Sequence, residues 1–187
     1  MPERRVGVWC CDAGKASGIA SCVVDLGRKT SSLRLLRERE HSESHTVAWS
    51  DVVPEGVEDG EMMSAWLGVT LGSEYARWAG EMRGLGVLET YMVLEQFRLR
   101  DGGLPGKAGL EVLLPLTINV GILSWLGVWN PGRAIFVNPS DGMGVMTNDR
   151  LRAAGCWVRG REHERDAWRY LGVALRRLRK RKAPPPR

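Results

Sequence analysis

Short apolar runs, separated by glycine and polar residues, dominate the first third of the chain. The first run covers about residues 5–11 and ends at Asp12, and a second covers residues 19–25 after a turn of small residues. A third segment, residues 32–39, alternates loosely between apolar and charged side chains. Runs of this length with turns between them predict three strands, paired as an antiparallel meander.

Helical spacing and short strands alternate in the rest of the chain. Apolar residues recur at helical intervals between Glu58 and Met82, so we expect a long helix there. The remaining pattern predicts a strand ending at Glu95, a helix within 110–129, a strand at 134–137, a short helix through Ala154 capped by Thr147, and a last helix from about Glu162. This is the element order of the ribonuclease H-like fold, an α/β fold whose mixed five-stranded sheet is flanked by helices.

The apolar segment from Leu110 to Trp129 approaches the length of a membrane span. Glu111, Pro115 and Asn119 interrupt it, and basic residues do not flank both of its ends. A crossover helix buried between two parallel strands is also apolar nearly all round. Because the segment lies between two predicted strands, we favour the buried crossover helix.

Positive charge is concentrated at one end of the chain. From Arg150 to Arg187 there are 13 basic and three acidic residues, whereas the remainder is net acidic. A basic segment on an acidic body is typical of proteins that bind polyanions, most often nucleic acids. The alternative is that the basic run merely solvates the last helix. We expect one domain over residues 1–180, followed by a basic, proline-rich tail at 181–187.

The cysteines exclude some classes of protein. Cys10, Cys11, Cys22 and Cys156 form no Cys-x-x-Cys pair, so a zinc site is not expected. Their mostly apolar neighbours indicate reduced core thiols in a cytoplasmic protein. The first five residues lead directly into a strand-like run with no cleavage site, so we expect no signal peptide.

Three acidic residues far apart in the chain are predicted to meet. Asp12 and Glu95 each end an apolar run, and Asp166 lies on the last predicted helix. A buried carboxylate is costly unless positive charge compensates it, so three of them in one domain suggest a divalent metal site. His163 is one helical turn before Asp166 and on the same face, where it is placed to ligate a metal or relay a proton.

Each of these residues also has a simpler interpretation. Asp12 would then only begin a turn, Glu95 would be an edge-strand charge, and His163 would be a surface or capping residue. Asp166 would pair with a neighbouring arginine on a solvated helix face; the arginines within reach are Arg161, Arg165 and Arg169. Glu164 lies off the face of His163 and Asp166, so we expect it to be exposed to solvent.

Several motifs together carry a resemblance to a known family. Residues 12–20, Asp-Ala-Gly-Lys-Ala-Ser-Gly-Ile-Ala, resemble the Asp-Pro-Gly-x-x-x-Gly signature of RuvC-type Holliday-junction resolvases, with alanine in place of proline. Residues 93–97 resemble the second acidic strand of that family, and residues 163–167, His-Glu-Arg-Asp-Ala, its C-terminal helix motif. The stretch from 138 to 157 is similar to bacteriophage-encoded members. The loop after Asp12 alone also resembles the phosphate-binding turn of actin-like ATPases, whose other motifs are not visible.

The resemblance implies a metal-dependent endodeoxyribonuclease that resolves four-way DNA junctions by paired nicks, leaving 5′-phosphate and 3′-hydroxyl ends. Two Mg²⁺ ions, or Mn²⁺, would be held by the catalytic residues Asp12, Glu95, His163 and Asp166. A homodimer is implied, in the host cytoplasm if the protein is phage-encoded. By position, we expect phosphate contacts from six residues: Lys15, Arg98, Arg100, Lys107, Arg159 and Arg161.

Two other functions remain open on the same residues. One is a nuclease that trims flaps, forks or other branched DNA. The other is a nucleic-acid-binding module on this fold without catalysis. Intact acids at Asp12, Glu95 and Asp166 argue against the second.

Overall fold

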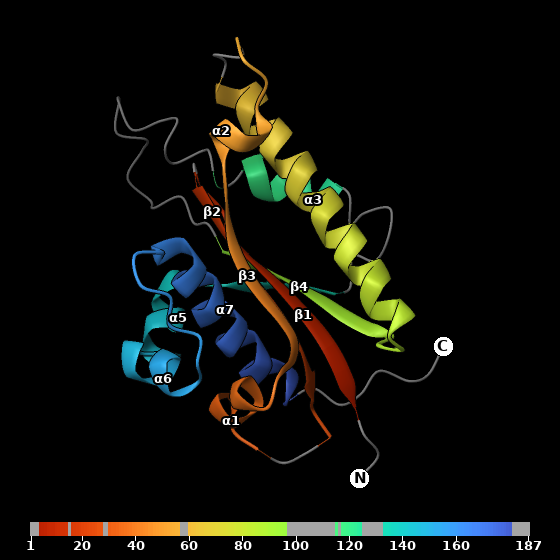
Figure 1. Cartoon of the computed structure of the whole chain (residues 1–187), viewed down its shortest axis with the longest axis vertical. Helices are drawn as coiled ribbons and strands as arrows, with labels where there is room; N and C mark the ends of the chain where they lie inside the picture. Colours follow the sequence, from red (N-terminus) through yellow and green to blue (C-terminus); the bar gives the residue numbers. More distant parts are fainter. Residues whose placement is uncertain are drawn as a thin grey trace.

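A five-stranded mixed sheet forms the centre of the molecule in the computed structural model (Figure 1). The structure describes residues 4–14, 16–27, 30–56, 60–96, 115, 117–124 and 133–180. The strand order is β3-β2-β1-β4-β5, with β1 antiparallel to β2, β2 antiparallel to β3, and β4 parallel to both β1 and β5. The strands are β1 (Arg5–Asp12), β2 (Ala16–Asp25), β3 (Glu40–Ala48), β4 (Glu89–Glu95) and β5 (Ala134–Val137). The mixed five-stranded sheet expected from the sequence is confirmed.

Helices cover both faces of the sheet (Figure 1). On one face lie α1 (Ser32–Arg37), α5 (Pro139–Val145), α6 (Asn148–Ala153) and α7 (Glu162–Leu178). On the other face lie α3 (Gly60–Gly84) and the helical residues 117–124, with the short α2 (Trp49–Val52) against α3.

The central strand β1 is buried on both faces, so its side chains alternate between two cores. Val6, Val8 and Cys10 pack on the side of α7, whereas Trp9 and Cys11 pack on the side of α3. Successive side chains of a strand point to opposite faces. Asp12, at the end of the strand, therefore falls on the same face as Cys10, towards α7.

The third predicted strand was misplaced. Residues 32–37 form α1, which the side chain of Ser31 caps by accepting a hydrogen bond from the backbone of Arg34. Leu35 and Leu36 are buried on the inner side of α1. The third strand is instead β3, which is an edge strand with mostly exposed polar residues. Backbone hydrogen bonds to β2 hold it, so it lacks the apolar alternation that would reveal it.

Other predicted elements are confirmed. The long helix, the strand ending at Glu95, the strand at 134–137 and the last helix all form, and the Thr147 side chain caps α6. The described residues of the apolar segment are helical, and the helix packs against α3 where Gly68 meets Gly121. Among the described residues, no helix has the length and apolar composition that a membrane crossing requires. The rest of that segment and the tail at 181–187 lie outside the described residues.

All four cysteines are buried and free, as core thiols are expected to be. Burial raises the pKa of the Cys10 and Cys11 thiols well above the usual value. Both therefore stay protonated near neutral pH and act as small apolar side chains in the two cores.

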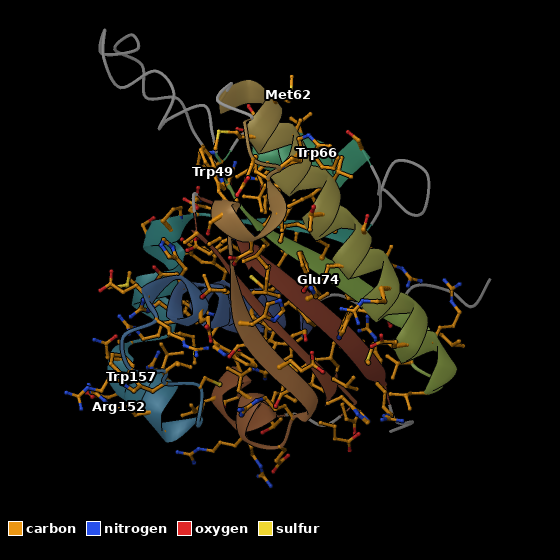
Figure 2. All side chains as sticks on the ribbon, turned by 45° about the horizontal axis from the view of Figure 1, so that its top comes forward. Trp49, Met62, Trp66, Glu74, Arg152 and Trp157 are labelled. Carbon is orange, nitrogen blue, oxygen red and sulfur yellow. The ribbon has the colours of Figure 1, made fainter. Side chains whose placement is uncertain are left out.

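An ion pair joins β3 to α3 on the face away from α7. The Nε2 atom of His45 lies 3.1 Å from Oε1 of Glu74, which Figure 2 labels on α3. The hydrogen bond to Glu74 is the largest cause of a raised His45 pKa, partial burial opposes it, and the charges of Glu74, Glu164 and Glu43 add to it. A His whose pKa is higher in the folded than in the unfolded state stabilises the fold below its unfolded pKa, and this contribution disappears as pH rises through the folded pKa.

We therefore predict that Glu74→Gln lowers the melting temperature at pH 6 by about 1–3 °C, because a partly exposed pair contributes less than about 1 kcal/mol. At pH 9 the difference between variant and parent should vanish. Thermal unfolding followed by circular dichroism at both pH values measures this. An equal loss at the two pH values would show that Glu74 acts by packing alone.

Candidate active site

Strand pairing places two of the predicted acids side by side. In the parallel register of β1 and β4, Cys10 is opposite Val93 and Cys11 is opposite Leu94. Asp12 and Glu95 are the next residues of the two strands, at the same edge of the sheet. Both fall on the face that α7 covers, because Cys10 and Val93 belong to the core on that side. The structure therefore places Asp12 and Glu95 next to each other.

Helix α7 brings the other two predicted residues to the same point. The Nδ1 atom of His163 lies 3.0 Å from Oδ2 of Asp12, and the two residues are 151 positions apart in sequence. Asp166 follows one turn later on the same face of the helix. Its negative charge raises the pKa of both Asp12 and Glu95, so the three carboxylates are within electrostatic range of one another.

The first turn of α7 can approach the sheet this closely only because β2 has a glycine there. Gly18 is paired with Asp12 across the β1–β2 ladder. A Cβ atom on Gly18 would lie 2.1 Å from the backbone carbon and oxygen of His163 and 2.6 Å from the backbone nitrogen of Glu164. These are backbone atoms, which cannot turn aside as a side chain does. Gly18 is therefore required for the contact between His163 and Asp12.

The turn after Asp12 is closed by a serine side chain. Ser17, which is fully buried, donates from its hydroxyl to the carbonyl of Gly14 and accepts from the backbone nitrogen of the same residue, at 3.1 and 3.3 Å. These bonds close the short connection that reverses the chain from β1 into β2. The small residues of this motif thus shape the turn and admit the helix.

The carboxylates have unusual proton affinities because they are crowded and partly desolvated. Burial raises the pKa of Asp12, and the hydrogen bond from His163 opposes that rise. Burial, followed by the negative charges of Asp12 and Asp166, raises the pKa of Glu95 to about 7. The hydrogen bond to Asp12 raises the pKa of His163 against a smaller effect of burial. Asp12 and His163 therefore form a charge-compensated pair, whereas Glu95 has no cationic partner among the described residues.

Glu164 is buried, so the prediction that it faces solvent was wrong. Only 1% of it is exposed, and its two carboxylate oxygens accept hydrogen bonds from Ser44 and Thr46 of β3 at 3.0 and 3.1 Å. Arg161 donates a third bond to Glu164 at 2.9 Å. These contacts fasten the first turn of α7 to the edge strand. The helical spacing alone could not show this, because β3 itself was not recognised.

Other residues around the site also escaped the sequence analysis. The buried Arg169 is bonded to Asp166, the pairing that the simpler interpretation of Asp166 allowed, although not on a solvated face. The ring of Tyr170 is buried beside the acids, and burial followed by the charges of Asp12, Glu95 and Asp166 raises its pKa strongly. On the opposite side, Asn119 donates to the backbone carbonyl of Glu95 at 3.0 Å and holds the end of β4.

The predicted DNA contacts are only partly described. Arg159 and Arg161 are exposed just before α7, and Arg161 also bonds Glu164. The other four predicted contacts lie outside the described residues; they are Lys15, Arg98, Arg100 and Lys107.

The described residues contain no group of three or more His, Cys, Asp or Glu side chains arranged to hold a metal ion. Two of the acids are instead engaged by cationic side chains, since His163 bonds one Asp12 oxygen and Arg169 bonds one Asp166 oxygen. The donor set is nevertheless that of a hard cation. Three crowded carboxylates, one of which stays protonated up to about neutral pH, would be relieved of mutual repulsion by a divalent ion.

Two solved structures that superpose on this chain are of RuvC. T. thermophilus RuvC in complex with a Holliday junction substrate superposes with a TM-score of 0.51 over 93% of this chain and 96% of that chain, at 14% identity. The structure of Thermus thermophilus RuvC gives a TM-score of 0.50 over 92% and 95% of the two chains, at 13% identity. No protein-family model and no curated protein matches the sequence. The chain therefore has the fold of RuvC, and the expected ribonuclease H-like architecture is confirmed.

We predict that Gly18→Ala destabilises the protein by at least about 1–3 kcal/mol, because overpacking against backbone forces α7 away from the sheet. Thermal unfolding would show a melting temperature several degrees lower. Gly14→Ala is the matched control from the same turn, because a Cβ atom there would meet only the backbone oxygen of Ala16 at an ordinary 3.5 Å. Equal melting temperatures for the two variants would contradict the role assigned to Gly18.

Proposed function

We propose that the protein is a metal-dependent endodeoxyribonuclease that acts on branched DNA and resolves four-way junctions by paired nicks. The observation that carries this proposal is the meeting of Asp12, Glu95 and Asp166 at one edge of a RuvC-like sheet, beneath the first two turns of α7. Likeness in fold alone supports a nuclease only weakly, since one fold hosts many functions. The acids add the chemistry that phosphodiester hydrolysis requires.

Asp12, Glu95 and Asp166 are proposed to hold two divalent cations, Mg²⁺ or Mn²⁺, with Asp12 central between the other two. Carboxylate oxygens are the ligands that Mg²⁺ prefers, and a site with few protein ligands suits its retention of water. When bound, such a pair of ions activates the attacking water and neutralises the leaving oxygen. The charge of Glu95, uncompensated among the described residues, makes it the acid with most to gain from a cation.

His163 is proposed to hold a proton at the edge of the site. Its Nδ1 atom faces Asp12, and its side chain is 49% exposed. The hydrogen bond to Asp12 raises its pKa, which increases the protonated fraction near neutral pH. A protonated His163 would neutralise phosphate charge and is placed to give a proton to a departing oxygen.

The surface available for DNA is narrower than the net charge implies. In the described C-terminal third, the side chains of four exposed basic residues form no hydrogen bond or ion pair with described residues, namely those of Arg159, Arg176, Arg179 and Lys180. Arg159 lies three residues before the first residue of α7, near the N-terminal end of this helix, which carries His163. We propose that Arg159 and Arg161 contact phosphates next to the acids. Lys15, Arg98, Arg100 and Lys107 remain proposed contacts from the sequence alone.

The deciding experiment is a cleavage assay with matched DNA substrates. Labelled four-way junction, flap and linear duplex are incubated with the protein, with and without Mg²⁺. We expect symmetric, Mg²⁺-dependent nicks in the junction and little cleavage of the duplex. Preferential cleavage of flaps would favour the flap or fork nuclease, and junction binding without cleavage would favour the non-catalytic module.

Asp12→Asn should abolish junction cleavage and leave junction binding intact, because it removes a metal-ligating charge and retains the shape of the side chain. Gel-shift titration and cleavage of the same labelled junction measure the two properties in parallel. A variant that cuts at the parental rate would refute the assignment of the site.

Paired nicks require two active sites, which a two-fold dimer supplies directly. The apolar candidates for its interface differ in exposure. Trp78 is 5% exposed and packs near Tyr75 in the core, so it is not available for a partner. Met62, Trp66 and Val69 form an outward stripe on α3, with 52%, 45% and 42% exposed. Figure 2 shows Met62 and Trp66 on this helix, near Trp49. We propose that this stripe contacts a second copy of the chain.

Trp66→Ser should convert a dimer into a monomer, because a large aromatic residue at the centre of an apolar stripe would contribute most to such an interface. Light scattering after size-exclusion chromatography gives the mass. Leu88→Ser is the control, since Leu88 is 74% exposed but lies outside the stripe. A parental protein that is monomeric both alone and on junction DNA would contradict the dimer and favour a flap or fork nuclease.

A further inference from the structure

Arg169 is a buried cation beside the candidate active site. Its side chain is 8% exposed, and it lies on α7 one turn after Asp166. One terminal nitrogen, Nη1, donates to Oδ1 of Asp166, and the other, Nη2, donates to Oδ1 of Asn148, the first residue of α6. The two ends of the guanidinium thus join the acid to a second helix.

This arrangement differs from an ordinary ion pair within a helix. Pairs three residues apart on an exposed surface contribute little and place no constraint on either partner. Arg169 is instead enclosed, because Gly142 of α5 brings that helix so close that a Cβ atom there would lie 3.3 Å from the Cβ of Arg169. Its buried Nε has no hydrogen-bond partner among the residues that the structure describes. Loss of the carboxylate that it does contact would leave an uncompensated buried charge, which is strongly destabilising.

The contact engages only one of the two carboxylate oxygens of Asp166. Oδ1 is taken by Arg169, whereas Oδ2 has no hydrogen-bond partner among the described residues. Asp166 is 34% exposed in its side chain and lies within electrostatic range of Asp12 and Glu95. A carboxylate held by one oxygen presents the other in a fixed direction. Such outer partners orient carboxylate ligands and affect metal affinity.

We propose that Arg169 is a positioning residue, which fixes the orientation of the Asp166 carboxylate for a divalent cation and, through Asn148, ties that orientation to the start of α6. This inference rests on the proposed function, because it assumes that the acids hold a metal ion. Arg169 itself touches neither substrate nor metal.

The direction of the change in metal affinity distinguishes a positioning role of Arg169 from a purely electrostatic effect of its charge. Loss of a positive charge next to a cation site should tighten metal binding if Coulomb energy alone matters. Loss of a positioning contact should weaken binding, by about tenfold or more. The probe is Mn²⁺ alone, titrated into the full-length protein without DNA, with free Mn²⁺ measured by electron paramagnetic resonance.

Arg169→Met should weaken Mn²⁺ binding by about tenfold. Asn148→Ala keeps both charges and the ion pair but removes the link to α6, so it should weaken binding by a smaller factor, about two- to tenfold. Asn148 is exposed, so its substitution is not expected to prevent folding. Asn148→Ala therefore tests the positioning role if Arg169→Met fails to fold. The control is Asp149→Asn, one residue further along α6, which contacts Arg152 and not Arg169.

The outcomes distinguish the inference from the proposed function. Parental protein that binds no Mn²⁺ would overturn the proposed metal site and, with it, the role of Arg169. Parental binding with equal or tighter binding by Arg169→Met would overturn the positioning role alone. Asn148→Ala with an affinity equal to that of Asp149→Asn would overturn the link through α6.

Discussion

The geometry of the site depends on one close contact between backbones, where the first turn of α7 lies on β2 at Gly18. Without that approach, His163 would not reach Asp12, and Asp166 would lie farther from the sheet. Glu164 secures the same turn from the side by its bonds to β3. The constraint is steric, because the two backbones can approach this closely only if residue 18 has no side chain. That approach determines which charged side chains lie close together.

Compensation of charge is the second requirement of the site. Asp12 has His163, and Asp166 has Arg169. Glu95 is the remaining acid, and its pKa of about 7 reflects burial beside two other carboxylates. The fold therefore tolerates the cluster without a metal by pairing two acids with cations and protonating the third. A divalent ion bound to Glu95 would take the place of that proton.

The sequence was enough to predict the central strands and the acids that end them, but not the edge strand or the buried contacts of the last helix. Asp12 and Glu95 could be placed because each ends an apolar run, and parallel neighbours in a sheet end together. The edge strand β3 could not be found, because backbone pairing with β2 holds its polar residues. Glu164 and Arg169 were missed for a related reason. Their burial comes from elements distant in sequence. Local spacing predicted that Glu164 is exposed, and it offered Arg169 only as one of three arginines that could pair with Asp166 on a solvated face.

The arginines show why net charge is a poor guide to the proposed DNA-binding surface. Arg37 donates to the carbonyl of Ala153 and Arg39 to that of Ala154, both at 2.8 Å, so they satisfy the last turn of α6. Arg152 lies over the ring of Trp157, as Figure 2 shows, at 4.3 Å from the ring centre. These cations are committed within the fold.

In the described C-terminal third, the exposed cations whose side chains have no partner are instead divided between the two ends of α7. Arg159 precedes the helix, and Arg176, Arg179 and Lys180 lie at its far end, roughly 15 Å or more beyond Asp166 at 1.5 Å per residue. Between these two ends, residues 167–175 of α7 are all buried. The described part of the basic segment therefore presents two separate groups of exposed cations and not one continuous basic surface.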